Sequence, residues 1–140
     1  MYDLMIIGSG PAGISAALTA KARNLNFIWF GSRALSTKIE KAEKIMNYPG
    51  LPAVTGSEMQ SVFLKQIDDC GITITESQVN SIYDCGGYFA AGADNEIYEA
   101  KAVIMTVGMT TTREIEGEAR LLGCGVSYCA TCDGALYKNK

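Results

Sequence analysis

The chain has 140 residues, of which 48% are hydrophobic and 19% charged, a balance typical of a folded domain and too apolar for a disordered one. It contains no histidine, which excludes Ser-His-Asp hydrolases, Cys-His proteases and His-ligated metal sites. The net charge of -3, without a basic run, argues against a nucleic-acid partner. No apolar stretch reaches the roughly 18 residues of a membrane helix, and no leader is recognised, so we expect a cytoplasmic protein with reduced thiols.

The N-terminal residues predict a βαβ unit. Tyr2–Ile7 is a short apolar run that ends at a glycine, which is typical of a buried parallel strand. Residues 11–23 predict a helix and residues 26–30 a second strand. This order of elements favours an α/β domain built on a parallel sheet.

The middle of the chain predicts a turn and a second helix. Residues 31–56 show little regular pattern apart from the turn at Asn47-Tyr48-Pro49-Gly50. The next helix opens at Thr55-Gly56-Ser57, with Ser57 and Gln60 spaced as a capping box, and Gly71 is expected to end it.

Short strands are expected in the rest of the chain. They are predicted at 72–75, 79–83, 88–91, 96–99 and 102–108, with turns at Gly86-Gly87 and Asp94-Asn95. Residues 117–140 read as irregular chain. Because no closing strand follows, we expect the sequence to be part of a longer protein.

A glycine-rich loop follows the first predicted strand. The chain there reads Gly8-Ser9-Gly10-Pro11-Ala12-Gly13, which fits GxGxxG between a strand and a helix. In such loops the first glycine permits the tight turn, the second lets the backbone approach a pyrophosphate, and the third lets the helix pack on the strand. The helix N-terminus supplies free N–H groups for the anion. The loop therefore predicts a bound dinucleotide.

The residues alone leave the identity of that dinucleotide open. The acid that usually holds a ribose hydroxyl after the second strand is absent, because Gly31, Ser32 and Arg33 follow Phe30 and the next acid is Glu40. Arg33 is compatible with the 2′-phosphate of NADP, with a pyrophosphate, or with a solvent-facing position.

The five cysteines are at positions 70, 85, 124, 129 and 132, an odd number that does not describe a disulfide framework. Cys70 and Cys85 are interpreted as structural thiols. The pair in Cys129-Ala130-Thr131-Cys132 lacks the second CxxC or His pair of a zinc ribbon. A redox dithiol is the favoured interpretation, with a chance spacing or a metal site as alternatives.

Taken together, these segments resemble the low-molecular-weight thioredoxin reductase family. The resemblance rests on the glycine-rich loop, the Asn47–Gly50 turn, Thr106-Val107-Gly108, and Val126-Ser127-Tyr128-Cys129-Ala130-Thr131-Cys132-Asp133-Gly134. It implies a Rossmann-like FAD-binding three-layer fold, with a parallel sheet plus a small antiparallel β element. Residues 1–114 would form the N-terminal part of the FAD-binding domain, and residues 115–140 the start of a second nucleotide-binding-like domain that carries the dithiol.

The resemblance also implies which residues hold the cofactor. FAD would lie against the glycine-rich loop, the segment after the second strand, the turn at 47–50 and the last strand, with the residues around Val79 at its adenine end. The residues implied are Gly8, Ser9, Gly10, Pro11, Ala12, Gly13, Gly31, Ser32, Arg33, Leu35, Ser36, Lys38, Ile39, Asn47, Val79, Thr106 and Gly108. One segment departs from the family. Residues 30–39 replace its usual Gly-Gly-Gln loop and look more like the clostridial ferredoxin-dependent flavin thioredoxin reductases.

The same resemblance implies a path for electrons. Cys132 would receive them from reduced FAD, and Cys129 would exchange with the disulfide of thioredoxin. Asp133 would act as acid and base for the thiol protons, or cap a helix N-terminus. We expect a homodimer at full length and favour ferredoxin over NADPH as donor. The alternatives are a redox-sensing FAD or nucleotide-binding module without turnover, and a peroxide-system reductase of the same superfamily.

Overall fold

The computed structural model describes residues 1–40, 42–109, 116–121 and 124–126. The chain divides into two compact units, Met1–Gly108 and Met109–Lys140. The domain boundary expected between residues 114 and 115 lies outside the described residues and stays a prediction.

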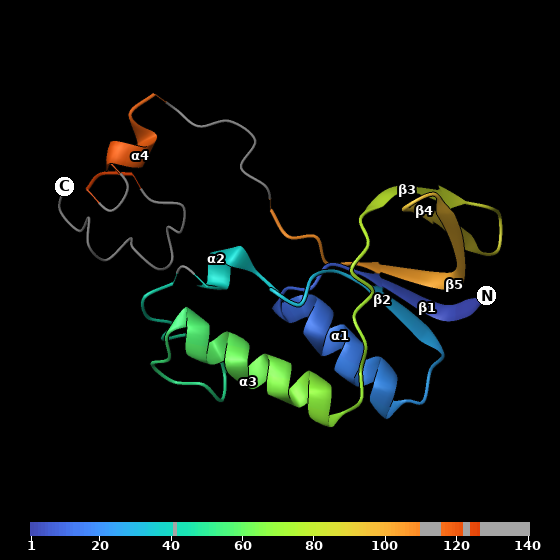
Figure 1. Cartoon of the computed structure of the whole chain (residues 1–140), viewed down its shortest axis with the longest axis horizontal. Helices are drawn as coiled ribbons and strands as arrows, with labels where there is room; N and C mark the ends of the chain where they lie inside the picture. Colours follow the sequence, from blue (N-terminus) through green and yellow to red (C-terminus); the bar gives the residue numbers. More distant parts are fainter. Residues whose placement is uncertain (41, 110–115, 122–123, 127–140) are drawn as a thin grey trace. The chain divides into compact units, whose positions relative to one another are not determined.

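The first unit is built on a five-stranded mixed sheet (Figure 1). Three neighbouring strands are parallel, and the remaining two continue the sheet in antiparallel fashion. The strand order across the sheet is β2 (Phe27–Phe30), β1 (Tyr2–Ile7), β5 (Glu96–Met105), β4 (Phe89–Ala93) and β3 (Val79–Asp84). The predicted combination of a parallel sheet with a small antiparallel element is confirmed.

The strand β5 joins the two parts of the sheet. Its first half pairs antiparallel with β4 and its second half parallel with β1, and Ala100 pairs with both Phe89 and Tyr2. Two separate strands were expected at 96–99 and 102–108, which is wrong. The hydrophobic pattern changes within β5 because its two halves have different neighbours, and this change gives one strand the appearance of two.

Two helices cover one face of the parallel strands. The helices α1 (Pro11–Ala22) and α3 (Gly56–Asp69) pack there with buried side chains that include Ile14, Phe63 and Ile67. The other face of the sheet forms a second core, in which Met5, Ile7, Ile28 and Phe30 meet alanines of β4 and β5. The described residues thus enclose two apolar layers, one on each side of the sheet.

The ends of α3 are defined by specific hydrogen bonds. Thr55 accepts a hydrogen bond from the N–H of Glu58, whose carboxylate accepts one from the N–H of Thr55. The predicted capping box at Ser57 and Gln60 is therefore wrong by two residues. Gly71 ends the helix as predicted, because its positive φ of 59° allows the N–H of Ile72 to reach the carbonyl oxygen of Ile67.

The segment after α3 does not form the strand expected at 72–75. It makes a single parallel bridge, between Thr75 and Phe30, on the outer side of β2. The turn at Asp94-Asn95 is confirmed, with φ of 46° and 68° at its two residues. Two consecutive positive φ values are typical of a type I′ hairpin turn, whose twist matches that of the flanking strands.

Two short helices complete the described structure. α2 (Thr37–Glu40) follows β2, and α4 (Glu118–Leu121) belongs to the second unit. In that unit the N–H groups of Cys124 and Val126 both donate to the carbonyl oxygen of Leu121. Among the described helices, none has the length and apolar character required to cross a membrane.

Candidate functional site

The three parallel strands end level with one another. In the sheet register Ile7 pairs with both Phe30 and Met105, which are the last residues of β2 and β5. The residues that follow, Gly8, Gly31 and Thr106, therefore lie along one edge. This carboxyl edge is where open α/β sheets bind their ligands.

Gly8 is the point at which the three strands converge. Its N–H donates to the carbonyl oxygen of Phe30 at 2.8 Å. Its own carbonyl oxygen accepts a hydrogen bond from the indole N–H of Trp29 at 2.8 Å. It also shares the hydroxyl proton of Thr106, at 3.0 Å, with the carbonyl oxygen of Ile7, at 2.9 Å. Gly8 has a φ of 112°, and an added Cβ would lie 2.4 Å from the carbonyl oxygen of Thr106. Only glycine fits this position.

The other two glycines of the loop meet opposite surroundings. A Cβ on Gly13 would lie 2.0 Å from the carbonyl oxygen of Gly8, so α1 approaches β1 this closely only because Gly13 lacks a side chain. A Cβ on Gly10 would meet nothing within 4 Å. The loop is therefore packed tightly on its inner side and open at Gly10, as expected of a loop over which a pyrophosphate lies.

The N-terminus of α1 is suited to an anion. No side chain caps it, its first turn carries no acidic residue, and Pro11 stands in that turn. The N–H groups of Ala12 and Gly13 precede the first helical hydrogen bond, which Ile14 donates to Gly10. Free N–H groups and the positive end of the helix dipole attract phosphate. These residues fit the pyrophosphate of a dinucleotide.

Ser9 joins this loop to the segment after β2. The buried Ser9 hydroxyl donates to the carbonyl oxygen of Leu35 and accepts a hydrogen bond from the N–H of Ser32, each at 3.0 Å. A Cβ on Gly31 would lie 2.5 Å from the Cβ of Ser9. The structure thus brings four predicted residues of two loops together at the edge.

Gln60 anchors the same segment from the side of α3. Its side-chain amide donates to the carbonyl oxygens of Ala34 and Ser36, at 3.0 and 2.8 Å. Between these two residues, Leu35 is buried with a positive φ of 54°. The sequence places Gln60 in a capping box, so this role of Gln60 was not predicted. The hydrogen bond from Trp29 to Gly8 was not predicted either, because the sequence shows Trp29 only as a residue of an apolar strand.

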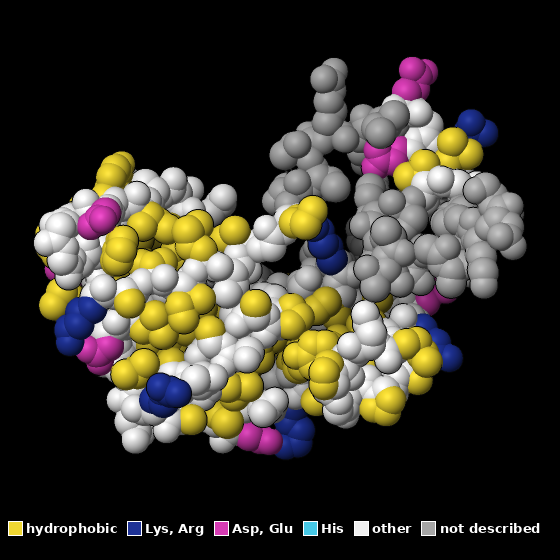
Figure 2. All heavy atoms as spheres, turned by 180° about the vertical axis from the view of Figure 1, so that it is seen from behind, with side chains coloured by type: hydrophobic (Ala, Val, Ile, Leu, Met, Phe, Trp, Pro, Cys, Tyr) yellow, Lys and Arg dark blue, Asp and Glu magenta, His cyan; other side chains and the backbone are white. Residues whose placement is uncertain are grey.

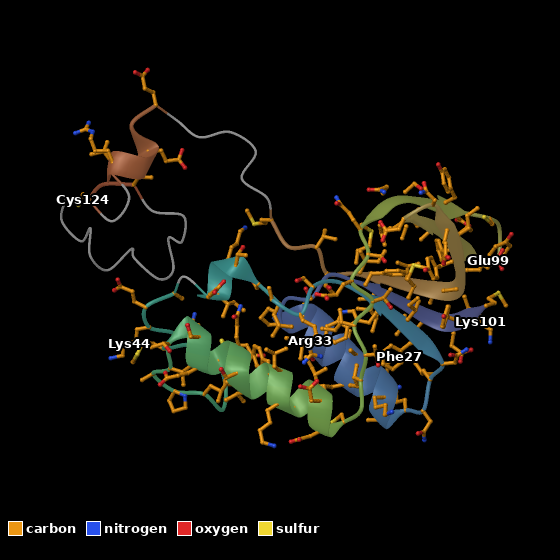
Figure 3. All side chains as sticks on the ribbon, viewed as in Figure 1. Phe27, Arg33, Lys44, Glu99, Lys101 and Cys124 are labelled. Atoms are coloured by element: carbon orange, nitrogen blue, oxygen red, sulfur yellow. The ribbon has the colours of Figure 1, made fainter. Side chains whose placement is uncertain are left out.

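Arg33 lies after β2 beside α3 (Figure 3). One guanidinium nitrogen of Arg33, Nη2, donates to both carboxylate oxygens of Asp68 at 3.0 Å, and the backbone N–H of Arg33 donates to Glu76 at 2.8 Å. Both charged side chains are about half exposed, at 48% and 53%. A 2′-phosphate that binds the guanidinium of Arg33 would have to compete with Asp68 for it.

The remaining predicted cofactor residues lie in other segments of the described structure. Asn47 is exposed in its turn, and Val79 begins β3, where it pairs with Ala93. Lys38 and Ile39 belong to α2, which packs so closely on α3 that a Cβ on Gly56 would lie 1.7 Å from the carbonyl oxygen of Ile39. Gly108 follows the edge with a positive φ of 69°.

A hollow of about 300 Å³ separates the start of α1 from the central turn. Pro11, Ile14, Tyr48 and Pro49 are among its lining residues. Tyr48 also contacts Phe63 of α3 edge to face, with ring centroids 5.5 Å apart. The turn that the sequence singled out therefore lies next to the phosphate loop, although Asn47 itself is not among the lining residues.

The predicted dithiol lies outside the described residues. Cys129, Cys132 and Asp133 therefore remain predictions from the sequence. Cys70, Cys85 and Cys124 are described, and all three are exposed free thiols.

Hydrophobic side chains are exposed on the face of the molecule that Figure 2 shows. The exposed hydrophobic side chains of the carboxyl edge include Met105 and Val107.

Comparison with known proteins gives a consistent result. The sequence profile of the family described as pyridine nucleotide-disulphide oxidoreductase matches residues 2–140. The chain is 33% identical to the thioredoxin reductase of Bacillus subtilis (strain 168) and 35% identical to that of Ureaplasma parvum serovar 3. Each match covers 100% of this chain. It covers 45% of the length of the Bacillus protein and 46% of that of the Ureaplasma protein, so the chain spans about half the length of these relatives.

Solved structures agree in fold. A ferredoxin-flavin thioredoxin reductase from Clostridium acetobutylicum matches with 48% identity and a TM-score of 0.78, over 97% of this chain and 47% of the other. The thioredoxin reductase of Streptococcus pyogenes matches with 35% identity and a TM-score of 0.81, over 97% and 45%. These similarities confirm the predicted Rossmann-like FAD-binding fold and the resemblance to thioredoxin reductases.

Proposed function

Because the chain belongs to the pyridine nucleotide-disulphide oxidoreductase family, we propose that it is the FAD-binding, dithiol-carrying part of a thioredoxin reductase. FAD is held at the carboxyl edge by the Gly8–Gly13 loop, the segment after β2 and Thr106. The physiological partner is thioredoxin, and the full-length protein is a cytoplasmic homodimer.

One observation carries the proposal for the cofactor. The loop is closed to any side chain at Gly8 and Gly13 but open at Gly10, directly before a helix N-terminus without an acidic or capping side chain. This arrangement accommodates a pyrophosphate and leaves its charge to the free N–H groups. The pairing of Arg33 with Asp68 supports FAD over NADP at this loop. When bound, FAD supplies the two electrons that reduce a disulfide.

The proposed chemistry on the chain's own residues is thiol–disulfide exchange. The thiolate of Cys129 attacks the disulfide of thioredoxin, and one sulfur of thioredoxin leaves with a proton. Cys132 gives up its proton, and its thiolate attacks Cys129 in the mixed disulfide. The second sulfur of thioredoxin leaves and is protonated, which releases dithiol thioredoxin and leaves a Cys129–Cys132 disulfide. Two electrons pass from the Cys129/Cys132 dithiol to the disulfide of thioredoxin. Asp133 exchanges the thiol protons, because the chain has no histidine for this task.

We propose ferredoxin as the electron donor. The support is the identity of 48% with the clostridial ferredoxin-flavin enzyme, against 35% with the streptococcal thioredoxin reductase, together with the unusual segment 30–39. A one-electron protein donor needs an exposed route to the flavin, whereas a nicotinamide must stack on the ring for hydride transfer.

The proposal is tested on the full-length protein purified with its flavin. It should be yellow, and denaturation should release FAD; a colourless protein that binds NADP at the Gly8–Gly13 loop would contradict it. Under anaerobic conditions, stoichiometric NADPH or NADH should leave the flavin band unchanged, and reduced ferredoxin should bleach it. Rapid bleaching by NADPH would refute the proposed donor and leave the proposed cofactor intact.

A further inference from the structure

We infer that Glu76 binds the ribose hydroxyls in the adenosine half of the dinucleotide. This inference rests on the proposed binding of FAD. It assigns to a residue outside β2 the role that an acid at the end of the second strand usually performs in dinucleotide sites.

An acid cannot occupy its usual place in this chain. The residue directly after β2 is Gly31, where an added Cβ would lie 2.5 Å from the Cβ of Ser9. Ser9 is held there by its hydrogen bonds to Leu35 and Ser32. Any side chain at position 31 would therefore break the contact between the two loops.

The backbone brings Glu76 to this same place from another segment. Thr75 bridges Phe30 on the outer side of β2: its N–H donates to Trp29 at 2.7 Å, and its carbonyl oxygen accepts from Gly31 at 3.1 Å. Glu76 is the next residue. Its Oε1 accepts the N–H of Arg33 at 2.8 Å, so the carboxylate is tied to the second residue after Gly31.

The remaining hydrogen-bonding capacity of this carboxylate suits a diol. An ionised carboxylate accepts about four hydrogen bonds and donates none. Glu76 is exposed, and the Arg33 N–H is the one partner found for its side chain among the described residues. A ribose offers two vicinal hydroxyl donors. The same negative charge repels a 2′-phosphate, and the guanidinium of Arg33 is paired with Asp68.

The experiment measures the dissociation constants of FAD and of an FAD whose adenosine ribose lacks both hydroxyls, by titration of the flavin-free protein. Glu76→Ala should weaken the binding of FAD by about tenfold or more, as expected for loss of hydrogen bonds to a charged acceptor. The same variant should bind the dideoxy analogue as the wild type does. Glu76→Gln, which keeps the length and one acceptor, should lie between, and Glu99→Gln on β5 is the matched control.

The outcomes separate a ligand contact from a structural role. If Glu76→Ala and Glu76→Gln weaken FAD and the dideoxy analogue equally, Glu76 only holds the loop through Arg33, and the inference fails while the proposed function stands. It fails in the same way if neither variant changes the affinity for FAD. If the wild-type protein binds no FAD, the proposed function fails, and this inference fails with it.

Discussion

The indole N–H of Trp29 donates a hydrogen bond to the carbonyl oxygen of Gly8 over 2.8 Å, from a side chain that is fully buried. A core residue of β2 thereby fixes the first peptide of the glycine-rich loop. Thr106 supports the same oxygen from β5. The conformation of the loop thus depends on two neighbouring strands as well as on its own glycines.

Trp29→Phe removes the indole N–H but keeps an aromatic ring in the core, so it should loosen this loop. It removes one hydrogen bond from a buried acceptor and leaves a small cavity, so we expect the protein to lose about 1–3 kcal/mol of unfolding free energy. Flavin affinity should fall several-fold, because the phosphate loop loses a support. Denaturant unfolding and flavin titration measure the two effects.

Thr106→Val tests whether Trp29 and Thr106 act on the same atom. Each single variant, Trp29→Phe or Thr106→Val, leaves the Gly8 carbonyl oxygen with one side-chain donor, and the double variant leaves it with none. The loss of flavin affinity in the double variant should exceed the sum of the single losses. Strict additivity would show that the two side chains do not share a function at Gly8.

Gly10→Ala and Gly13→Ala should separate binding from folding. A methyl group on Gly13 would lie 2.0 Å from the carbonyl oxygen of Gly8, so this variant should lose about 3 kcal/mol or more, or fail to fold. A methyl group on Gly10 meets open space, and its φ of -72° suits any residue. Gly10→Ala should keep its thermal unfolding midpoint but bind FAD at least about tenfold more weakly. Unchanged binding would mean that no pyrophosphate passes over Gly10.

The capping box of α3 predicts a specific dependence on pH. The backbone N–H of Thr55, and then its hydroxyl, hold the pKa of Glu58 below its ordinary value of about 4.3. Because the pKa is lower in the folded state, this carboxylate stabilises the protein above pH 4.3, and the contribution disappears as pH falls through the folded-state pKa. Wild type should therefore lose more stability between pH 5 and about pH 3 than Glu58→Gln does.

Thr55→Ala and Glu99→Gln complete this comparison. Loss of the N-cap hydroxyl should cost about 1 kcal/mol at neutral pH. Glu99 lies on β5 and caps no helix, so its replacement should leave the acid-side profile of the wild type unchanged. A Glu58→Gln profile equal to that of the wild type would contradict the assigned role of the capping box.

The dithiol is tested by single replacements in the flavin-loaded protein. Cys129→Ser should leave flavin reduction intact and abolish reduction of thioredoxin, whereas Cys132→Ser should block transfer from flavin to disulfide. Cys70→Ser, at the end of α3, is the control and should retain full activity. Reduction of thioredoxin at the normal rate by a variant that lacks both thiols of the dithiol would refute the mechanism.

The sequence predicts the elements whose signal is local. The apolar run of Tyr2–Ile7, the GxGxxG loop and the helix-ending Gly71 depend on neighbouring residues, and all three are found where expected. The capping box was misplaced because Thr55-x-x-Glu58 and Ser57-x-x-Gln60 both fit the pattern. Local spacing cannot reveal that Gln60 is occupied by a distant loop.

Contacts that depend on how strands pair with one another cannot be predicted from such local patterns. The convergence of Trp29 and Thr106 on Gly8 depends on the register of β1 with both β2 and β5, which no local pattern encodes. The approach of Glu76 to the end of β2 depends on a single bridge, between Thr75 and Phe30. The candidate site is therefore predicted in its loop but not in the contacts that shape it.

The pairing of β1 with β5 also determines when this sheet can form. Tyr2 and Ala100 are partners at the centre of the sheet, although they stand at opposite ends of the first unit in sequence. During synthesis, almost the whole unit must emerge before β5 is available to pair with β1. Until then one edge of β1 is unpaired. Closing so long a loop is entropically costly and slows folding. An unpaired apolar strand is an aggregation hazard in that interval, so faster elongation up to β5 or a chaperone bound to β1 would raise the yield of folded protein.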